Sequence, residues 1–411
     1  MKIAIHLATL TALSGLAVIP AVSTADNVLG FEQQLEDALK LGGGKINIDL
    51  RWRFEYADDS TPKRQGYGDP FRIHIGYLTP EFHGLSAYAE YEGVQTVFTG
   101  KYNSIVNRNN TNRAVIADPE RHEVNRLWIQ YAGVKDTVLK VGRQRIKLDN
   151  DRFIGNVGWR QMEQTYDSVR LTNTSLPDTI VDFAYIWKQR DILSRNVNMD
   201  SFVAHASYNG FEYGKITGYA YLLDYDDAAD SLAFRRSNHT YGLSFKGSAP
   251  LVEDIKLVYK AEYAHQWDFQ KNPNSYSTDY WNGELGFDIH GVTVKGGIEQ
   301  LAADNGVGFQ TPLATLHAFN GWADQFLATP ADGLQDIYVS VGTTVQGIKL
   351  LGVYHTFTDE DHDVDYGQEF NALAVKKFGK HYQVLLKYAH YEADTFKTDT
   401  DKFWLMTGMS F

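Results

Sequence analysis

Eight arginines in the first half of the chain offer the clearest chemistry. Most fall where charged and apolar residues alternate, and residues 143–160 hold five Lys or Arg against two Asp. A guanidinium group stays charged, and its planar fork can hold a carboxylate with two hydrogen bonds. Rings of such side chains in a pore favour anions. The predicted pore-lining and solute-contacting residues are Arg51, Arg53, Arg72, Arg126, Arg143, Arg145, Arg160 and Arg170.

The same arginines have a structural interpretation that the sequence leaves equally open. Any wide barrel lumen carries charges of both signs, and pairs across neighbouring strands stiffen the wall. The candidate partners are Asp49, Glu55, Glu90, Glu92 and Asp167. In that case most of the arginines brace the wall instead of contacting a solute.

No catalytic or metal-binding constellation stands out. Ser237 and His239 in RSNHTYG could suggest an outer-membrane hydrolase, but nothing marks a third, orienting residue. The thirteen histidines show no metal spacing, and cysteine is absent. The acid-rich segments DYDDAAD and DEDHDVD could bind Ca²⁺, although solvated loops explain them more simply. We therefore predict no catalytic residue, no metal and no cofactor.

The segments that carry the arginines are predicted to be β-strands. In KINIDLRWRFEY, residues 45–56, the even-numbered positions from Ile46 to Tyr56 place apolar side chains on one face of a strand. The odd-numbered positions from Lys45 to Glu55 place polar side chains on the other face. The same alternation recurs in FRIHIGYLT, IKLVYKAEYAHQW, WNGELGFDI and VTVKGGIEQ, and less cleanly in YQVLLKYAHY. An apolar face toward lipid and a charged face toward a water-filled lumen is typical of a transmembrane β-barrel.

The connections support the same fold class. Short turns such as IHGV alternate with long polar loops, and an outer-membrane barrel has this pattern of periplasmic turns and external loops. About eighteen antiparallel strands are predicted over residues 45–411, as one domain. A secreted sandwich or propeller is the alternative. The long loop 301–333 could fold inward as a constriction, with Phe309, Phe319, Trp322 and Phe326 either stacking on sugars or anchoring the loop.

The N-terminus predicts export. Lys2, the apolar run from Ile3 to Val18 and the small residues before Asp26 fit a signal peptide over residues 1–25, cleaved after Ala25. A membrane anchor is the alternative. Residues 26–44 are predicted to form a short periplasmic helix or leader, and the final aromatic residue, Phe411, resembles the signal read by the barrel-assembly machinery.

Two segments resemble a known family. The stretch GRQRIKLDNDRFIGNVGWRQMEQTYDSVRL, residues 142–171, is similar to the alginate-export family of outer-membrane channels, as is ALKLGGGKINIDLRWRFEY. The resemblance implies a monomeric eighteen-stranded barrel with an arginine-rich lumen, in a family whose best-known member exports alginate. The matching pieces are Gly142-Arg143-Gln144, Asp151-Arg152, Trp159-Arg160-Gln161, Thr165-Tyr166-Asp167 and Arg170.

These observations predict a passive channel in the outer membrane of a Gram-negative cell. The expected cargo is an anionic or polyhydroxylated solute, and an acidic oligosaccharide or polysaccharide such as alginate is the most specific version. A non-specific porin and an adhesive barrel with a closed lumen are the alternatives. Expected partners are outer-membrane lipid and lipopolysaccharide, whereas a net charge of −12 argues against nucleic acid.

Overall fold

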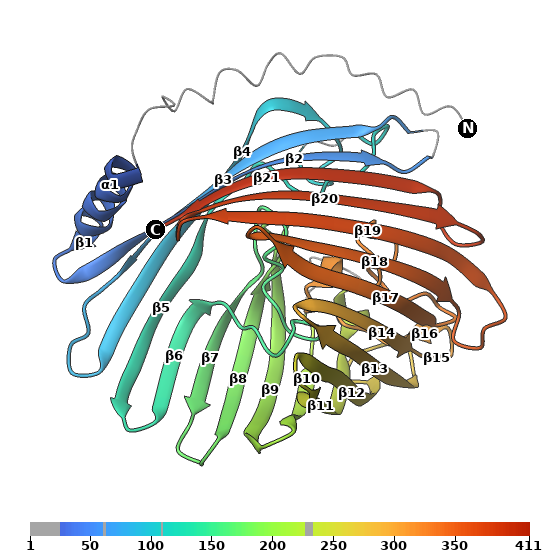
Figure 1. Cartoon of the computed structure of the whole chain (residues 1–411). Coiled ribbons are helices and arrows are strands. Elements are labelled where there is room, and N and C mark those ends of the chain that lie inside the picture. Colours follow the sequence, from blue (N-terminus) through green and yellow to red (C-terminus); the bar gives the residue numbers. More distant parts are fainter. Residues whose placement is uncertain (1–24, 61–62, 108–109, 227–232) are drawn as a thin grey trace.

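The strands form one closed antiparallel barrel. The computed structural model describes residues 25–60, 63–107, 110–226 and 233–411. Among these, eighteen long strands each pair with their neighbours, and the last strand returns to the first, with Asp49 opposite Ser410 and Asp58 opposite Asp401 (Figure 1). The prediction of an all-β barrel of about eighteen strands is therefore confirmed.

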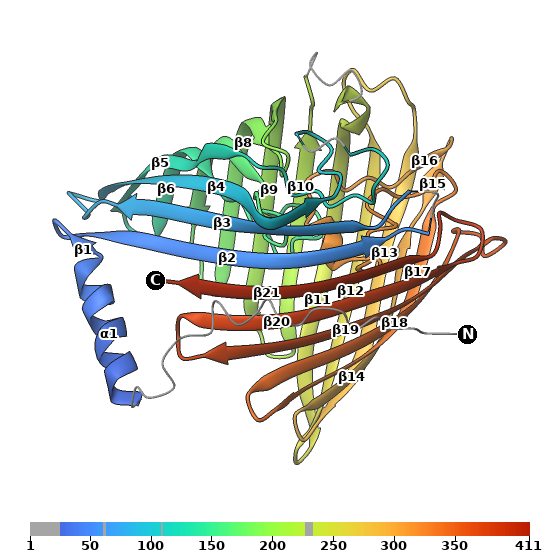
Figure 2. The same cartoon turned by 90° about the horizontal axis from the view of Figure 1, so that it is seen from above.

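The barrel strands follow one another around the wall in chain order (Figure 2). They are β2 (Gly44–Asp58), β3 (Gly66–Leu78), β4 (Leu85–Lys101), β5 (His122–Val134), β6 (Thr137–Gln144), β7 (Thr165–Asn173), β8 (Thr179–Arg190), β9 (Asn196–Phe211), β10 (Gly214–Leu223), β11 (Asn238–Val252), β12 (Ile255–Asp268), β13 (Ser277–Ile289), β14 (Val292–Leu301), β17 (Leu334–Val345), β18 (Ile348–Thr358), β19 (Asp365–Phe378), β20 (Tyr382–Ala393) and β21 (Thr400–Ser410). The minor elements are α1 (Ala25–Ala38), β1 (Lys40–Leu41), η2 (Ala233–Arg236), β15 (Ala303–Asp304), β16 (Val307–Gly308) and η3 (Leu316–Ala318).

The alternation within each strand sets which side chains reach the lumen. On β2, Arg51, Arg53 and Glu55 are buried inside the barrel. Trp52 and Phe54, between them, lie on the half-exposed outer face. The outer face of later strands carries exposed apolar residues such as Leu285 and Val341, as a lipid-facing surface requires. No helix among the described residues is both long and apolar enough to cross a bilayer.

The two ends of the barrel differ in their connections. At one end the strands are joined by tight turns, of which 290–291 and 346–347 have positive φ at both central residues, the geometry that suits a two-residue hairpin. At the other end long loops join the strands. Since turns lie on the periplasmic side of such barrels and loops lie outside, the tight-turn end is the periplasmic end.

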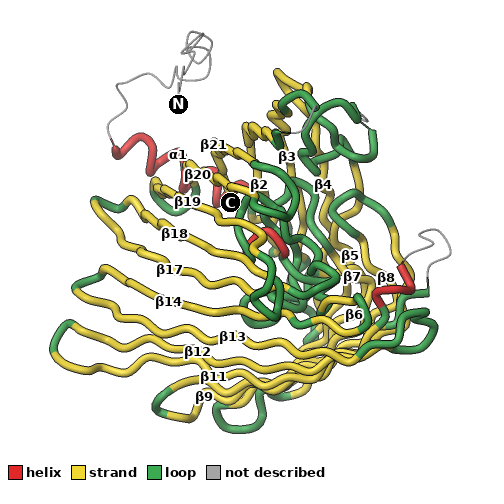
Figure 3. The backbone as a smooth tube through the Cα atoms, turned by 90° about the vertical axis from the view of Figure 1, so that its right-hand side faces the viewer, coloured by secondary structure: helices red, strands yellow, loops and turns green. Residues whose placement is uncertain are grey.

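Three of the long loops fold back into the barrel instead of projecting outward. They are loop A (described residues 102–107 and 110–121, between β4 and β5), loop B (145–164, between β6 and β7) and loop C (302–333, between β14 and β17). Figure 3 shows loops gathered inside the ring of strands. Loops B and C are joined directly, because Ile154 forms a bridge with Leu313 and Gly155 N donates to Leu313 O at 2.9 Å.

The hydrophobic core of the protein therefore lies inside the lumen. Ile146, Phe153 and Ile154 of loop B pack with Phe309, Leu313 and Phe326 of loop C against inward-facing strand residues. The aromatic residues of loop C mostly anchor it, as one of the two sequence interpretations held. Phe326 stacks on Phe396 at 5.2 Å, and Phe309 packs beside Tyr280 at 5.5 Å.

The N-terminal helix lies outside the barrel wall. Helix α1 covers Ala25–Ala38, and Glu36 Oε1 contacts His381 Nε2 at 2.9 Å in the periplasmic turn before β20. His381 also stacks on Phe411 at 4.1 Å, so the last residue is buried at this rim. The proposed signal peptide falls almost wholly on residues 1–24, which lie outside the described residues, and its cleavage and the role of Phe411 in assembly stay predictions.

Candidate functional site

Seven of the eight predicted arginines point into the lumen or its loops. Arg51, Arg53, Arg72 and Arg160 are buried, whereas Arg126, Arg145 and Arg170 keep part of their side chains exposed. Six of these seven are within ion-pair distance of a carboxylate. The pairs are Arg53 with Asp118, Arg72 with Asp49, Arg126 with Glu90, Arg145 with Glu163, Arg160 with Glu55 and Asp324, and Arg170 with Asp182.

The prediction that Arg143 lines the pore is wrong. On β6 it shares a face with Leu139 and Val141, which are exposed on the outside of the barrel. Its Nε donates to Asp167 Oδ1 at 2.7 Å, and Asp167 alternates with the fully buried Tyr166 and Ser168 on β7. A charged residue can face outward here because the pair lies near the external end of the strands, where they leave the apolar belt.

Four of the five carboxylates expected as partners do bind these arginines. Asp49, Glu55, Glu90 and Asp167 pair with Arg72, Arg160, Arg126 and Arg143. Glu92 instead contacts His74 Nε2. The structural interpretation of the arginines thus describes most of their contacts, and their role toward a solute stays a prediction.

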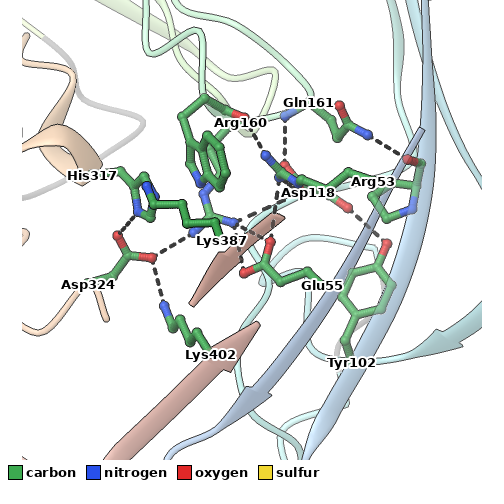
Figure 4. A network of polar contacts seen from close by, with 12 residues as sticks. Arg53, Glu55, Tyr102, Asp118, Arg160, Gln161, His317, Asp324, Lys387 and Lys402 are labelled. Atoms are coloured by element: carbon green, nitrogen blue, oxygen red, sulfur yellow. Dashed lines mark hydrogen bonds and ion pairs between the residues drawn. The ribbon is translucent and has the colours of Figure 1, made fainter. Parts of the chain in front are cut away.

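Arg160, at the tip of loop B, joins three parts of the chain. Its Nη1 lies 3.1 Å from Glu55 Oε2 on β2, and its Nη2 lies 2.8 Å from Asp324 Oδ2 on loop C (Figure 4). Both carboxylates are buried, and charges so far from water are stable only when they are paired and hydrogen-bonded. Arg160 therefore fastens loops B and C to the wall.

Asp118 brings loop A to the same place. Its carboxylate pairs with Arg53 and accepts from Gln161 N at 2.8 Å, and its carbonyl accepts from Tyr102 Oη at 2.9 Å. Beside it, Arg51 Nε donates to Gln161 Oε1 at 2.7 Å. All three inward loops thus meet at one point on the inner face of β2.

Asp324 is the centre of the second half of the network. Figure 4 shows Arg160, His317 and Lys402 converging on it. Its Oδ1 lies 2.6 Å from His317 Nδ1, and its Oδ2 lies 2.7 Å from Lys402 Nζ on β21. The Nε2 atom of His317 lies 2.7 Å from Lys387 Nζ on β20, so a neutral imidazole accepts a hydrogen bond from the ammonium.

The loop tip is held by one further carboxylate. Glu369 Oε1 on β19 accepts from Ala323 N at 2.8 Å and also from Trp322 N. Gly321 has a φ of +84°, and a Cβ there would lie 2.3 Å from Glu369 Oε2. Only glycine fits this position, because any side chain would both strain the backbone and strike the carboxylate.

The network shifts the pKa values of His317 and Asp324, two titratable groups of loop C, in the same direction. Burial and the neighbouring Lys387 ammonium hold the pKa of His317 well below its ordinary value of 6.5. The Asp324 carboxyl is also buried, but Lys402 and His317 outweigh that and hold its pKa well below 3.8. At neutral pH the docked loop therefore carries a neutral imidazole and an ionised carboxylate.

Acid is expected to loosen loop C through His317. In a released loop, His317 takes up a proton below about pH 6.5, whereas in the docked loop it stays neutral, so docking weakens by up to ~1.4 kcal/mol per pH unit below that value. The contribution of Asp324 is complete above about pH 4 and is lost only as the pH falls through its depressed value. Channel noise or protease sensitivity between pH 7 and 4.5 measures the effect.

The control for this prediction is His317→Gln, which removes the titrating group. Its pH profile should be flatter than that of the wild type over the same range. Identical profiles would mean that loop C is insensitive to the protonation of His317.

Two cavities flank the network. The larger, of about 600 Å³, is lined by Arg160, His317 and Asp324 and by residues of loops B and C. The smaller, of about 240 Å³, lies against β12–β18 and is lined by Lys260, Lys295 and Trp322. Volumes of ~300–1,000 Å³ are usual for sites that hold a small molecule, so the larger cavity could hold one solute.

Ser237 and His239 do not form a catalytic pair. Ser237 Oγ accepts from Tyr225 N at 2.9 Å, whereas His239 packs on Phe269 at 3.8 Å on the outer face. Ser237 lies before the first residue of β11, Asn238, so the alternation of the strand does not place it on the same face as His239. The hydrolase alternative has no support in this geometry.

An eighteen-stranded barrel with a lipid-facing outer surface and a lumen narrowed by inward loops is an outer-membrane channel, not an enzyme. The alginate export family model matches residues 44–306, more than half of the chain, and the chain belongs to this family. The family resemblance found in the sequence is confirmed. No curated protein matches the chain in sequence.

Solved outer-membrane porins share the fold at low sequence identity. OpdL of Pseudomonas aeruginosa is 15% identical, with a TM-score of 0.68 over 90% of this chain and 99% of that one. A BenF-like porin from Pseudomonas fluorescens Pf-5 is 13% identical, with a TM-score of 0.71 over 90% and 99%. OpdK of Pseudomonas aeruginosa, solved with vanillate, is 13% identical, with a TM-score of 0.68 over 89% and 98%.

Proposed function

We propose that this protein is a passive channel for small anionic or polyhydroxylated solutes. The observation that carries the proposal is the meeting of loops A, B and C at a cation-rich cluster. There, Arg51, Arg53, Arg160, Lys387 and Lys402 face four carboxylates, those of Glu55, Asp118, Asp324 and Glu369. Five cations against four carboxylates leave one positive charge uncompensated among these residues, which favours passage of an anion.

The inward loops favour a small solute over a polymer. Cavities of about 600 and 240 Å³ suit one or a few rings, whereas a polysaccharide needs a continuous passage. Vanillate, named with the OpdK structure, is a small aromatic acid. The family description supports a uronate, the acidic sugar of alginate, so an alginate fragment is the second candidate and would require loop C to move aside.

Anion selectivity is the direct test. Purified protein in a planar bilayer, under a salt gradient, is expected to give a reversal potential of the sign for anions, more strongly at low ionic strength because salt screens the lumen charges. Glucuronate should interrupt the current at lower concentrations than glucose does. A channel with no ion preference and no block by either sugar would be a general porin.

A further inference from the structure

Lys387 lies in a cage of three tryptophans. Its ammonium is 3.8 Å from the ring centre of Trp322, 4.2 Å from that of Trp159 and 5.5 Å from that of Trp404. The tryptophans come from loop C, loop B and β21, so the docked loops complete the cage. His317 closes one side, since it stacks on Trp159 at 4.5 Å and 7° and accepts from Lys387 at 2.7 Å.

The caged ammonium lacks the partner that a buried cation needs. Lys387 is 7% exposed, and among the described residues no carboxylate oxygen lies within ion-pair distance of its Nζ. Asp324 is occupied by Arg160, His317 and Lys402, and Glu369 Oε1 is occupied by two backbone N–H groups. Indole faces and one imidazole nitrogen stabilise the cation only in part.

Other donors in the same cluster are also without partners. Trp159 Nε1, Trp404 Nε1 and Arg53 Nε are buried, and none of them has a hydrogen-bond acceptor among the described residues. Glu369 Oε2 lacks a donor, so one acceptor is unused as well. Around Lys387 the shortage is mainly of acceptor oxygens, which a carboxylate or a hydroxylated ring would supply.

The cage borders both cavities through its two loop C residues. Trp322 lines the smaller one together with Lys260 and Lys295, and His317 lines the larger one together with Arg160. The cluster of five cations and four carboxylates described above has one positive charge in excess. A single excess charge matches a solute with one carboxylate better than a multiply charged solute.

We propose that the caged ammonium of Lys387 is a binding subsite for the carboxylate of a single-ring acid, such as a uronate or an aromatic acid. The carboxylate accepts from Lys387, and the ring packs against Trp322, the indole of the cage that also lines the smaller cavity. The inference rests on the proposed function and specifies its substrate class. Small movements of the loop C tip, which carries Trp322 and His317, admit the solute.

The test is block of the single-channel current by glucuronate, with glucose as the neutral ring of the same size. In Lys387→Gln, the half-blocking concentration of glucuronate should rise about tenfold or more, because a hydrogen bond to a charged group is lost, while that of glucose should stay unchanged. Lys387→Arg, which keeps the charge, should retain most of the block. Lys349→Gln, on the exposed lumen face of β18, removes a lysine outside the cage and is the matched control.

The outcomes separate the subsite from the proposed function. If Lys387→Gln keeps its anion selectivity and is blocked by glucuronate as the wild type is, the subsite is wrong and the channel stands. If the wild type has no anion preference and no block, both are wrong. Should Lys387→Gln fail to fold, Trp404→Phe removes one unpartnered donor and keeps the ring, and an unchanged glucuronate block there would overturn the subsite.

Discussion

Replacing residues 310–327 by a short Gly-Ser linker is expected to raise the single-channel conductance roughly threefold or more. An eighteen-stranded barrel without inward loops encloses a wide aqueous channel. These residues of loop C fill part of that space, because they carry Leu313, Trp322 and Phe326 into the core inside the lumen. The measurement is the current step of the variant in a planar bilayer, compared with the wild type at the same salt concentration.

The wall should tolerate this replacement. Strands β14 and β17 pair directly from Leu301 opposite Leu334 to Thr293 opposite Gly342, so their register does not depend on the loop between them. The matched control shortens the exposed connection at residues 270–273, where Lys271 is 73% exposed in its side chain. That variant should keep the wild-type conductance. An unchanged current after removal of 310–327 would mean that loop C does not constrict the pore.

The barrel could be predicted from the sequence because residues close together in the chain determine its strands and turns. The period-two alternation within each strand indicates which side chains face the lumen and which face outward, as in Trp52 against Arg51 and Arg53. The residues of a tight turn, such as 289–292, likewise indicate the geometry of that turn. Even the polar face of β20, which holds Lys387, follows from the alternation in YQVLLKYAHY. Neighbouring strands then pair in chain order without long-range choices.

The site could not be predicted because its contacts are not local. Arg160 and Asp324 are 164 positions apart, and the tryptophans around Lys387 come from three separate segments. The sequence neighbours of Lys387 do not predict that tryptophans surround it. The sequence neighbours of His317 and Lys402 do not predict that both contact the same carboxylate. The segment Trp159-Arg160-Gln161 was singled out by its family resemblance, and Arg160 also by its charge, but neither signal indicated that this tip of loop B contacts β2.

Arg143 shows a different limit of the sequence. Its neighbours place it on an alternating strand, but alternation alone does not say where the strand leaves the lipid. Near the external rim a polar side chain is tolerated on either face. Arg143 and Arg160 are both arginines paired with carboxylates, yet one pair lies on the outer wall and the other is buried at the meeting point of the loops.

This difference predicts unequal costs for removing the two arginines. Arg160→Met is expected to lower the free energy of unfolding by about 3–5 kcal/mol, because Glu55 and Asp324 stay buried with a partner missing. Arg143→Met should cost about 1 kcal/mol or less, since a partly exposed pair contributes little. Urea unfolding in detergent or lipid vesicles, followed by the heat-modifiable mobility of the barrel, measures both.

A double variant tests whether the unpaired charge is the cause. Glu55→Gln in the Arg160→Met background removes the carboxylate that lost its main partner, so the pair of changes should cost less than Arg160→Met alone. Arg53, 3.5 Å from Glu55, would then rely on Asp118. If the double variant is instead as unstable as the sum of the two single ones, the cost of Arg160→Met comes from lost packing at the loop tip. A cost equal to that of Arg143→Met would show that the Arg160 pairs do not hold the loops in place.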